Sequence, residues 1–270
     1  MRRAAVLVLL AGAAAAEPGA LHRPAALDAA AFGAGEACFL VREVASGRAV
    51  VEHGGELCRA PARPCSTLKV PLAAVAFQEG LFTSPGTVLP WDGRPRGRAA
   101  LDQDLTPRTY LEVSANWVSE RIVEGLGAER VEAVLAGLLE GPTVAVALPV
   151  EVGLVEDGVR LAPEDQVAFW RRLWNGTLPL SPEAREALLA SLPRHRAGDL
   201  SIHGKTGTCC IDPGCETGPG RQLGWYVGVA ARGEEAYAFA LQLTDLEPTT
   251  GYAGGRARNL VERLLPEVLP

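Results

Sequence analysis

The chain has 270 residues, of which 48% are apolar and 21% are charged, and its formal net charge at pH 7 is −6. This is the composition of a globular protein with a sizeable core, and it excludes collagen-like, coiled-coil and disordered chains. The acidic balance also argues against a nucleic acid or an anionic membrane as a partner.

The N-terminus begins with two arginines, continues with an apolar run over 4–16 and has small residues at Ala14 and Ala16. A charged start, a short apolar stretch and an Ala-x-Ala end are typical of a secretory signal peptide. We therefore expect a signal peptide at 1–16 and one folded domain over 17–270, in the periplasm or secreted. No other segment is long and apolar enough to cross a membrane, so we expect no membrane anchor.

An exported protein meets an oxidising environment, so its six cysteines predict disulfides. Proximity in the chain suggests two groups, although the sequence does not determine the pairing: Cys38, Cys58 and Cys65, and then Cys209, Cys210 and Cys215. A metal site formed by the second group and His203 is the less favoured alternative, because the spacing lacks a paired Cys-x-x-Cys pattern. We accordingly predict no metal.

The first predicted elements are a hairpin over 39–53, with its turn at Ser46-Gly47, and a helix over 66–77. A Thr-Pro pair, typical of a helix start, predicts a short helix over 107–113. Further helices are expected in the middle of the chain, at 118–126, 129–139, 163–175 and from Pro182 onward.

Near the C-terminus, two apolar runs of strand length, 223–230 and 236–243, predict a second hairpin connected by 232–235. A last helix is expected over 256–265. Strands at both ends and helices in the middle predict an α/β fold of the α+β type. We expect one antiparallel sheet built from both chain ends and flanked by helices, with an all-helical subdomain at about 83–195.

Ser66 and Lys69 form a Ser-x-x-Lys motif at a predicted helix start. A spacing of three places the hydroxyl and the amine on the same helix face. A serine hydroxyl needs a base to become a nucleophile, and a desolvated lysine can serve because burial disfavours its charged form. The helix N-terminus also offers a backbone N–H near the nucleophile. Alone, the motif is weak evidence for catalysis.

A Ser-x-Asn motif follows at Ser114 and Asn116, between two predicted helices. The hydroxyl can relay a proton, and the amide can hold a carbonyl group of a substrate. Like the first motif, this pair is common by chance, and its plain interpretation is a turn between helices.

Lys205, Thr206 and Gly207 form a Lys-Thr-Gly motif on a predicted edge strand. The lysine and threonine can bind a carboxylate, and the glycine allows a substrate backbone to approach. Thr208 follows, with a hydroxyl contact and a second N–H for an oxyanion. The three motifs in this order are the set found in penicillin-recognising serine acyl-transferases.

The chain resembles class D (oxacillinase-type) β-lactamases over nearly its whole length, from about 38 to about 265. The similar segments are 64–72, 91–93, 104–105, 203–208 and 224–228. The resemblance implies a β-lactamase/transpeptidase-like fold, with the active site between the sheet and the helical subdomain.

The resemblance also implies a role for each motif residue. Ser66 is the acylated nucleophile, Lys69 the general base, and Ser114 the relay for the proton of the leaving group. Substrate binding is assigned to Asn116, Lys205, Thr206, Gly207, Thr208 and Arg256, with Arg258 as a close rival of Arg256.

Three departures from the class D pattern concern the base. Asn116 replaces a valine, 140–142 reads Glu-Gly-Pro instead of Tyr-Gly-Asn, and Leu154 replaces a tryptophan. In class D enzymes, CO₂ converts the lysine to a carbamate, which is held in an apolar pocket by the tryptophan N–H. We expect weak carbamylation of Lys69 or none, and no other cofactor.

The leading hypothesis is a serine β-lactamase that hydrolyses β-lactams through an acyl-Ser66 intermediate. The alternative is a penicillin-binding protein or DD-peptidase acting on D-Ala-D-Ala-like peptides, or a penicillin sensor that stays acylated. Glu140 is a weak candidate for the deacylation base, because single loop glutamates are usually exposed. The oligomeric state does not follow from the sequence.

Overall fold

The computed structural model describes residues 27–33, 35–141, 145–146, 158–215 and 218–270. The predicted signal peptide and Leu154 lie outside these ranges. Among the residues described, no helix has the length and hydropathy that crossing a membrane requires.

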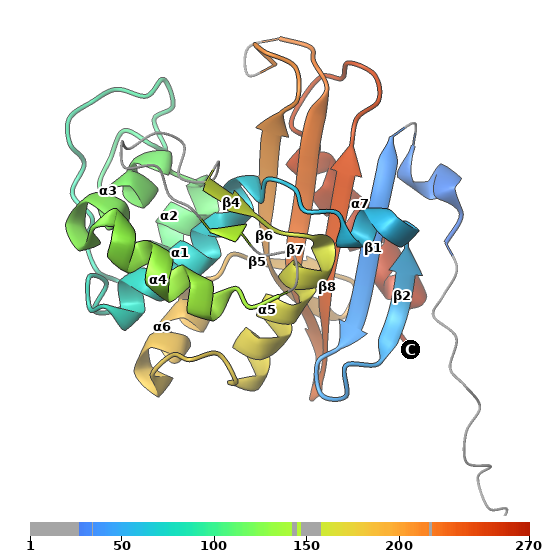
Figure 1. Cartoon of the computed structure of the whole chain (residues 1–270), viewed down its shortest axis with the longest axis horizontal. Helices are drawn as coiled ribbons and strands as arrows, with labels where there is room; N and C mark the ends of the chain where they lie inside the picture. The colour runs from blue at the N-terminus through green and yellow to red at the C-terminus, as the bar shows by residue number, and fades with distance from the viewer. Residues whose placement is uncertain (1–26, 34, 142–144, 147–157, 216–217) are drawn as a thin grey trace, which may run out of the picture.

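A six-stranded antiparallel sheet forms the centre of the molecule, with strand order β2-β1-β8-β7-β6-β5 (Figure 1). Strand β1, from the start of the chain, pairs along its whole length with β8, from near the end. The prediction of one antiparallel sheet built from both chain ends is therefore confirmed. The strands are β1 (Glu36–Glu43), β2 (Ala49–His53), β5 (Arg194–Ala197), β6 (Leu200–Cys210), β7 (Gln222–Arg232) and β8 (Glu235–Thr244).

The helices cover both faces of this sheet. Helix α7 lies on the far face in Figure 1, while the other helices lie on the near face or beside the sheet. The α-helices are α1 (Lys69–Gln78), α2 (Pro107–Val113), α3 (Asn116–Leu126), α4 (Ala128–Leu138), α5 (Pro163–Asn175), α6 (Pro182–Ser191) and α7 (Ala253–Val268). Shorter elements are the 3₁₀ helices η1 (Ala29–Phe32), η2 (Gly55–Arg59) and η3 (Cys65–Leu68), and a ladder of β3 (Ala145–Val146) with β4 (Val159–Arg160).

Strand β7 separates two hydrophobic cores. Trp225 and Val227 pack with the helices of the near face, whereas Tyr226 and Ala230 pack with α7. All four side chains are fully buried. Because both faces are covered, the strand reads as a continuous apolar run rather than as an alternating one.

The local signals for helices and hairpins hold well. Thr106 caps α2 by accepting from the N–H of Thr109, as the Thr-Pro pair predicts. Both predicted hairpins are confirmed, but the second has a tighter turn, since Arg232 and Glu235 already pair in the ladder. Strand β5 was not expected, because its exposed, basic sequence carries no apolar alternation.

Candidate functional site

Ser66 lies in η3, and Lys69 begins the α-helix that continues from it. The Lys69 Nζ donates a hydrogen bond to the Ser66 Oγ at 3.1 Å. The lysine side chain is fully buried at the head of α1. The predicted same-face geometry is therefore present, and it gives the serine hydroxyl a nearby amine that can accept its proton.

The turn that carries Ser66 is held by hydrogen bonds from both sides. Thr67 donates to the carbonyl of Pro64 at 2.6 Å and accepts from Gln166 of α5 at 2.8 Å. Trp225 of β7 donates its indole N–H to the carbonyl of Arg63 at 2.9 Å. Elements of the sheet and of the helical layer thus position the Ser66 turn together. Trp225 lies in the segment 224–228 that resembles class D enzymes, whereas no motif pointed to Gln166.

Ser114 ends α2 in the left-handed conformation, with φ of +60°. A residue with a Cβ atom rarely adopts this conformation, so the backbone is strained at this point. Its Oγ is buried and has no hydrogen-bond partner among the described residues. Asn116 lies two residues on, exposed at the start of α3.

Strand β6 has an uncovered edge close to the turn that carries Ser66. Gly204 donates its N–H to Pro193 on the side of β5, and in a regular ladder every second residue points the same way. The N–H groups of Thr206 and Thr208 therefore face that edge, beyond Arg194, the first residue of β5, and no other described strand pairs with them there. The Lys205 amine lies at the same edge and donates to the Thr206 carbonyl at 2.9 Å.

Gly207 of β6 packs closely against the turn that carries Ser66. A Cβ atom there would lie 3.0 Å from the Pro64 carbonyl oxygen, 3.1 Å from Thr67 Cγ2 and 3.2 Å from Cys65 Cβ. Packing against the turn therefore favours a glycine at this position, because any larger residue would require the turn to shift. The sequence analysis gives another reason for this glycine, namely that it allows a substrate backbone to approach.

The disulfides are Cys38–Cys58, Cys65–Cys209 and Cys210–Cys215. The expected grouping by chain proximity is wrong for Cys65 and Cys209, which are 144 residues apart in the chain. The fold brings β6 against the turn of Ser66, so contact in space decides the pairing. The alternative of a metal site on the second cysteine group fails as well, because all three sulfurs are in disulfides.

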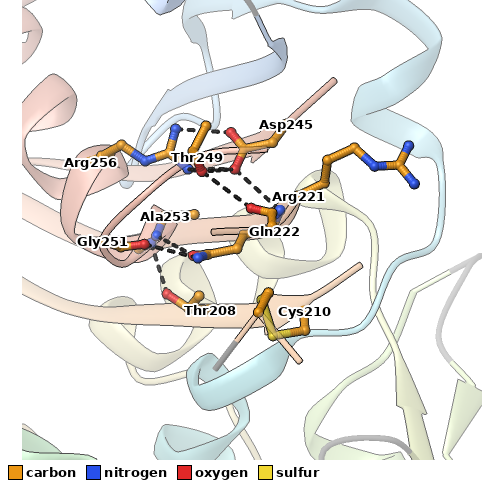
Figure 2. Close-up of polar contacts among 12 residues, drawn as sticks. Thr208, Cys210, Arg221, Gln222, Asp245, Thr249, Gly251, Ala253 and Arg256 are labelled. Carbon is orange, nitrogen blue, oxygen red and sulfur yellow. Dashed lines mark hydrogen bonds and ion pairs between the residues drawn. A yellow bond between two sulfur atoms is a disulfide. The ribbon is translucent and has the colours of Figure 1, made fainter. Parts of the chain in front are cut away.

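The start of α7 is anchored beside Thr208 (Figure 2). The Thr208 hydroxyl accepts from the N–H of Gly254 at 2.9 Å, and the Gln222 side chain accepts from Ala253 at 2.9 Å. These bonds satisfy two of the free N–H groups at the helix N-terminus. The Gln222 amide also donates to the carbonyl of Gly251 at 2.9 Å. The Thr208 side chain therefore points toward α7, on the face of β6 opposite to the turn that carries Ser66.

Arg256 forms an internal ion pair (Figure 2). Its guanidinium donates to both carboxylate oxygens of Asp245, at 2.9 and 2.6 Å, and to Thr249 at 3.1 Å. Burial alone would raise the pKa of Asp245, but the hydrogen bonds from Arg256 and Thr249 outweigh it and lower the pKa. The guanidinium assigned to a substrate carboxylate is thus engaged within the protein.

Arg258 lies where Arg256 was expected. It lines a cavity of about 130 Å³ together with Lys205 and Thr206, and α2 contributes Glu112 to the same cavity. The Nε of Arg258 is buried without a hydrogen bond among the described residues, although it lies 3.7 Å from a carboxylate oxygen of Glu262. The sequence placed both arginines near this site, and the structure separates them.

Glu140 lies in an exposed position, with 68% of its side chain accessible, and its carboxylate pairs with Arg172 of α5 at 3.2 Å. It lines a surface cavity that it shares with Glu129 and Glu132 of α4 and with none of the motif residues. The interpretation of Glu140 as an exposed loop carboxylate agrees with this geometry.

Comparison with known proteins identifies the family. Residues 52–265 match the family described as the penicillin binding protein transpeptidase domain. The β-lactamase OXA-19 of Pseudomonas aeruginosa is 29% identical over 180 residues, which cover 67% of this chain and 66% of that protein. The chain thus matches just under two thirds of the length of that relative. The β-lactamase OXA-9 of Klebsiella pneumoniae is 25% identical over 243 residues, with 86% and 88% covered.

Solved structures show the same fold. The class D β-lactamase OXA-427 superposes with a TM-score of 0.72 at 27% identity, covering 86% of this chain and 97% of that one. A class D β-lactamase from Bacillus subtilis superposes with a TM-score of 0.75 at 21% identity, covering 88% and 94%. The sheet and its helical layers are therefore those of this group of structures.

Proposed function

Since this chain belongs to the penicillin-binding protein transpeptidase domain family, we propose that it is a serine β-lactamase acting through an acyl-Ser66 intermediate. The observation that carries the proposal is the hydrogen bond between Ser66 and the buried amine of Lys69, beside the uncovered edge of β6. The relatives named as β-lactamases support this substrate class. The predicted signal peptide supports a periplasmic or secreted location, where β-lactams and cell-wall peptides occur.

The acylation step uses four residues. Lys69 accepts the hydroxyl proton of Ser66 while the Oγ attacks the lactam carbonyl carbon. The N–H groups of Ser66 and Thr208 stabilise the negative charge that forms on the carbonyl oxygen. The C–N bond of the ring then breaks, and Ser114 passes a proton to the leaving nitrogen. Water hydrolyses the resulting ester and releases Ser66.

We assign the substrate carboxylate to the cavity that Lys205, Thr206 and Arg258 line. Two cations and a hydroxyl can neutralise and hydrogen-bond one carboxylate there. Arg256, already paired with Asp245, supports this region from the other side of α7. Asn116 is exposed at the start of α3, and we assign its side-chain amide to bind an amide carbonyl of the substrate.

We further propose that Lys69 works as a free amine, with little carbamylation. Asn116 is an exposed polar residue on the first turn of α3, whereas a carbamate of the class D type needs an apolar wall at this motif position. A carbamate would supply an anionic base for both steps. Without it, the Lys69 Nζ, which lies 3.1 Å from the Ser66 Oγ, serves as the base in both acylation and deacylation.

The second candidate is a penicillin-binding protein or DD-peptidase, or a penicillin sensor with slow deacylation. The position of Glu140 favours it, because this exposed carboxylate pairs with Arg172 and shares its cavity with none of the motif residues, so it does not supply a base to the attacking water. One experiment separates the candidates. The protein is mixed with a chromogenic cephalosporin, and the product is counted per enzyme while intact mass is followed. Many turnovers support a β-lactamase, and one equivalent with a stable adduct supports the alternative. No adduct, or retained reactivity in Ser66→Ala, would refute both.

A further inference from the structure

One disulfide joins the two segments that the proposed reaction brings together. Cys65 immediately precedes Ser66, and Cys209 immediately follows Thr208. Their Cα atoms are 5.6 Å apart, although 144 residues separate them in the chain. The other two disulfides are local by comparison, with separations of 20 and 5 residues.

The backbone of Cys65, one of the two linked residues, has an unusual conformation. Cys65 has φ of +53°, one of two non-glycine residues with positive φ in the described part of the chain, and the other is Ser114. A side chain with a Cβ atom disfavours this conformation. The hydrogen bonds from Trp225 and Gln166 hold Arg63 and Thr67 on either side of Cys65, which is itself buried and part of η3. The disulfide adds a covalent restraint to the residue next to the nucleophile, from a strand that is 144 residues away in the chain.

We propose that Cys65 and Cys209 are positioning residues, whose disulfide fixes the two backbone N–H donors of the oxyanion site, those of Ser66 and Thr208. The donors come from a 3₁₀ turn and from the uncovered edge of β6, so no single element sets their spacing. Stabilisation of the oxyanion depends on donors that are already in place when the charge forms. This inference rests on the proposed acyl-transfer function and adds a residue pair to it.

The test compares two double variants with the wild type. In Cys65→Ala/Cys209→Ala the proposed positioning link is absent. In Cys210→Ala/Cys215→Ala a neighbouring disulfide at the end of the same strand is absent, which makes it the matched control. Stopped-flow mixing with a chromogenic cephalosporin gives the acylation rate constant and the dissociation constant of the complex before acylation. A boronic acid, which forms a tetrahedral adduct on the nucleophile, measures oxyanion binding directly.

We expect the first variant to lose about tenfold in acylation rate, less than the 10²- to 10³-fold that follows removal of one donor. Its affinity for the boronic acid should fall by a similar factor, while the first dissociation constant changes less than twofold. The control should keep wild-type values. Unchanged acylation in the first variant, or equal losses in both variants, would overturn the proposal.

A third variant covers the case in which Ala at position 65 prevents folding. In Cys65→Gly/Cys209→Ala the glycine accepts a positive φ without strain, so any loss reports the missing link rather than the backbone. The same tenfold loss is expected, and wild-type acylation would again contradict the inference. If the wild-type protein forms no acyl adduct at all, the proposed function fails first, and that result is distinct from any difference between the variants.

Discussion

Arg256 and Asp245 are joined by two hydrogen bonds, and the carboxylate of Asp245 is almost completely buried while the arginine is about one third exposed. A buried carboxylate left without its partner is costly, which makes this pair a structural element of the region where α7 meets the sheet.

We expect Arg256→Ala to act mainly on stability. Loss of one partner of a buried pair costs about 3–5 kcal/mol, and the exposure of the guanidinium reduces this to about 2 kcal/mol. Because the pKa of Asp245 is lowered in the folded state, the stabilisation is present near neutral pH and is lost as the pH falls through that lowered value. Urea unfolding at pH 7 and pH 3 checks this, and a difference between wild type and variant that is unchanged at pH 3 would contradict it.

Arg258→Ala should act on substrate binding instead. Removal of one charge-assisted hydrogen bond to the carboxylate costs about 1.5–3 kcal/mol, so KM should rise by roughly tenfold or more with a small effect on stability. Arg258→Lys keeps the charge and should recover part of the affinity. Steady-state kinetics on a β-lactam, with Arg256→Ala as the matched control, measure this. A larger KM increase in Arg256→Ala than in Arg258→Ala would reverse the assignment.

Arg256 and Arg258 illustrate which structural features the sequence can predict and which it cannot. Two residues apart on a helix, they lie about 200° apart around its axis. The sequence places both near the third motif, but only the packing of Ala257 and Val261 against the sheet decides which arginine faces β6. The capped helices and the hairpins, in contrast, depend on neighbouring residues, and they were predicted to within a few residues.

The pairing of Cys65 with Cys209 could have been predicted from the sequence. Cys65 is adjacent to Ser66, and Cys209 follows the Lys-Thr-Gly-Thr segment that must approach the same nucleophile. A single site formed by both motifs implies that these two cysteines lie close together. Gln166, which holds Thr67, gave no such signal, because a lone glutamine inside a helix is usually part of an exposed face.

Gly207→Ala should disturb the contact between β6 and the nucleophile turn. The added Cβ lies 3.0 Å from the Pro64 carbonyl oxygen, and neither backbone segment can move freely because a disulfide joins them. We expect a loss of about 1–3 kcal/mol in stability and a lower acylation rate. Gly137→Ala in α4, where an added Cβ atom meets nothing within 4 Å and φ is not positive, serves as the control that should leave acylation and stability near wild-type values. Wild-type acylation and stability in Gly207→Ala would show that the turn yields to the strand.

We expect the protein to lose stability at mildly acidic pH because His203 is partly buried. Burial lowers its pKa below the usual 6.5, and Arg194 adds to the effect. The unfolded chain therefore binds the proton first, so the stabilisation is complete above pH 6.5 and decreases as the pH falls toward the folded value. The variant His203→Phe keeps an aromatic contact with Trp174 of α5 and removes the titration. Thermal unfolding at pH 8 and pH 5 should show a smaller difference for the variant, whereas an identical difference would exclude His203 as a contributor.

The state of Lys69 gives the last prediction. A carbamate forms when a neutral lysine amine adds CO₂, and it persists only where its negative charge is held by neighbouring donors. Here the amine already donates to Ser66 at 3.1 Å, and the second motif offers the exposed Asn116 in place of an apolar wall. We expect no saturable carbamate signal in ¹³C NMR with labelled bicarbonate, and no increase of turnover on adding bicarbonate. Lys69→Ala provides the background spectrum and should abolish acylation. A strong signal in the wild type that disappears in Lys69→Ala would establish the carbamate, and the amine mechanism would then be wrong.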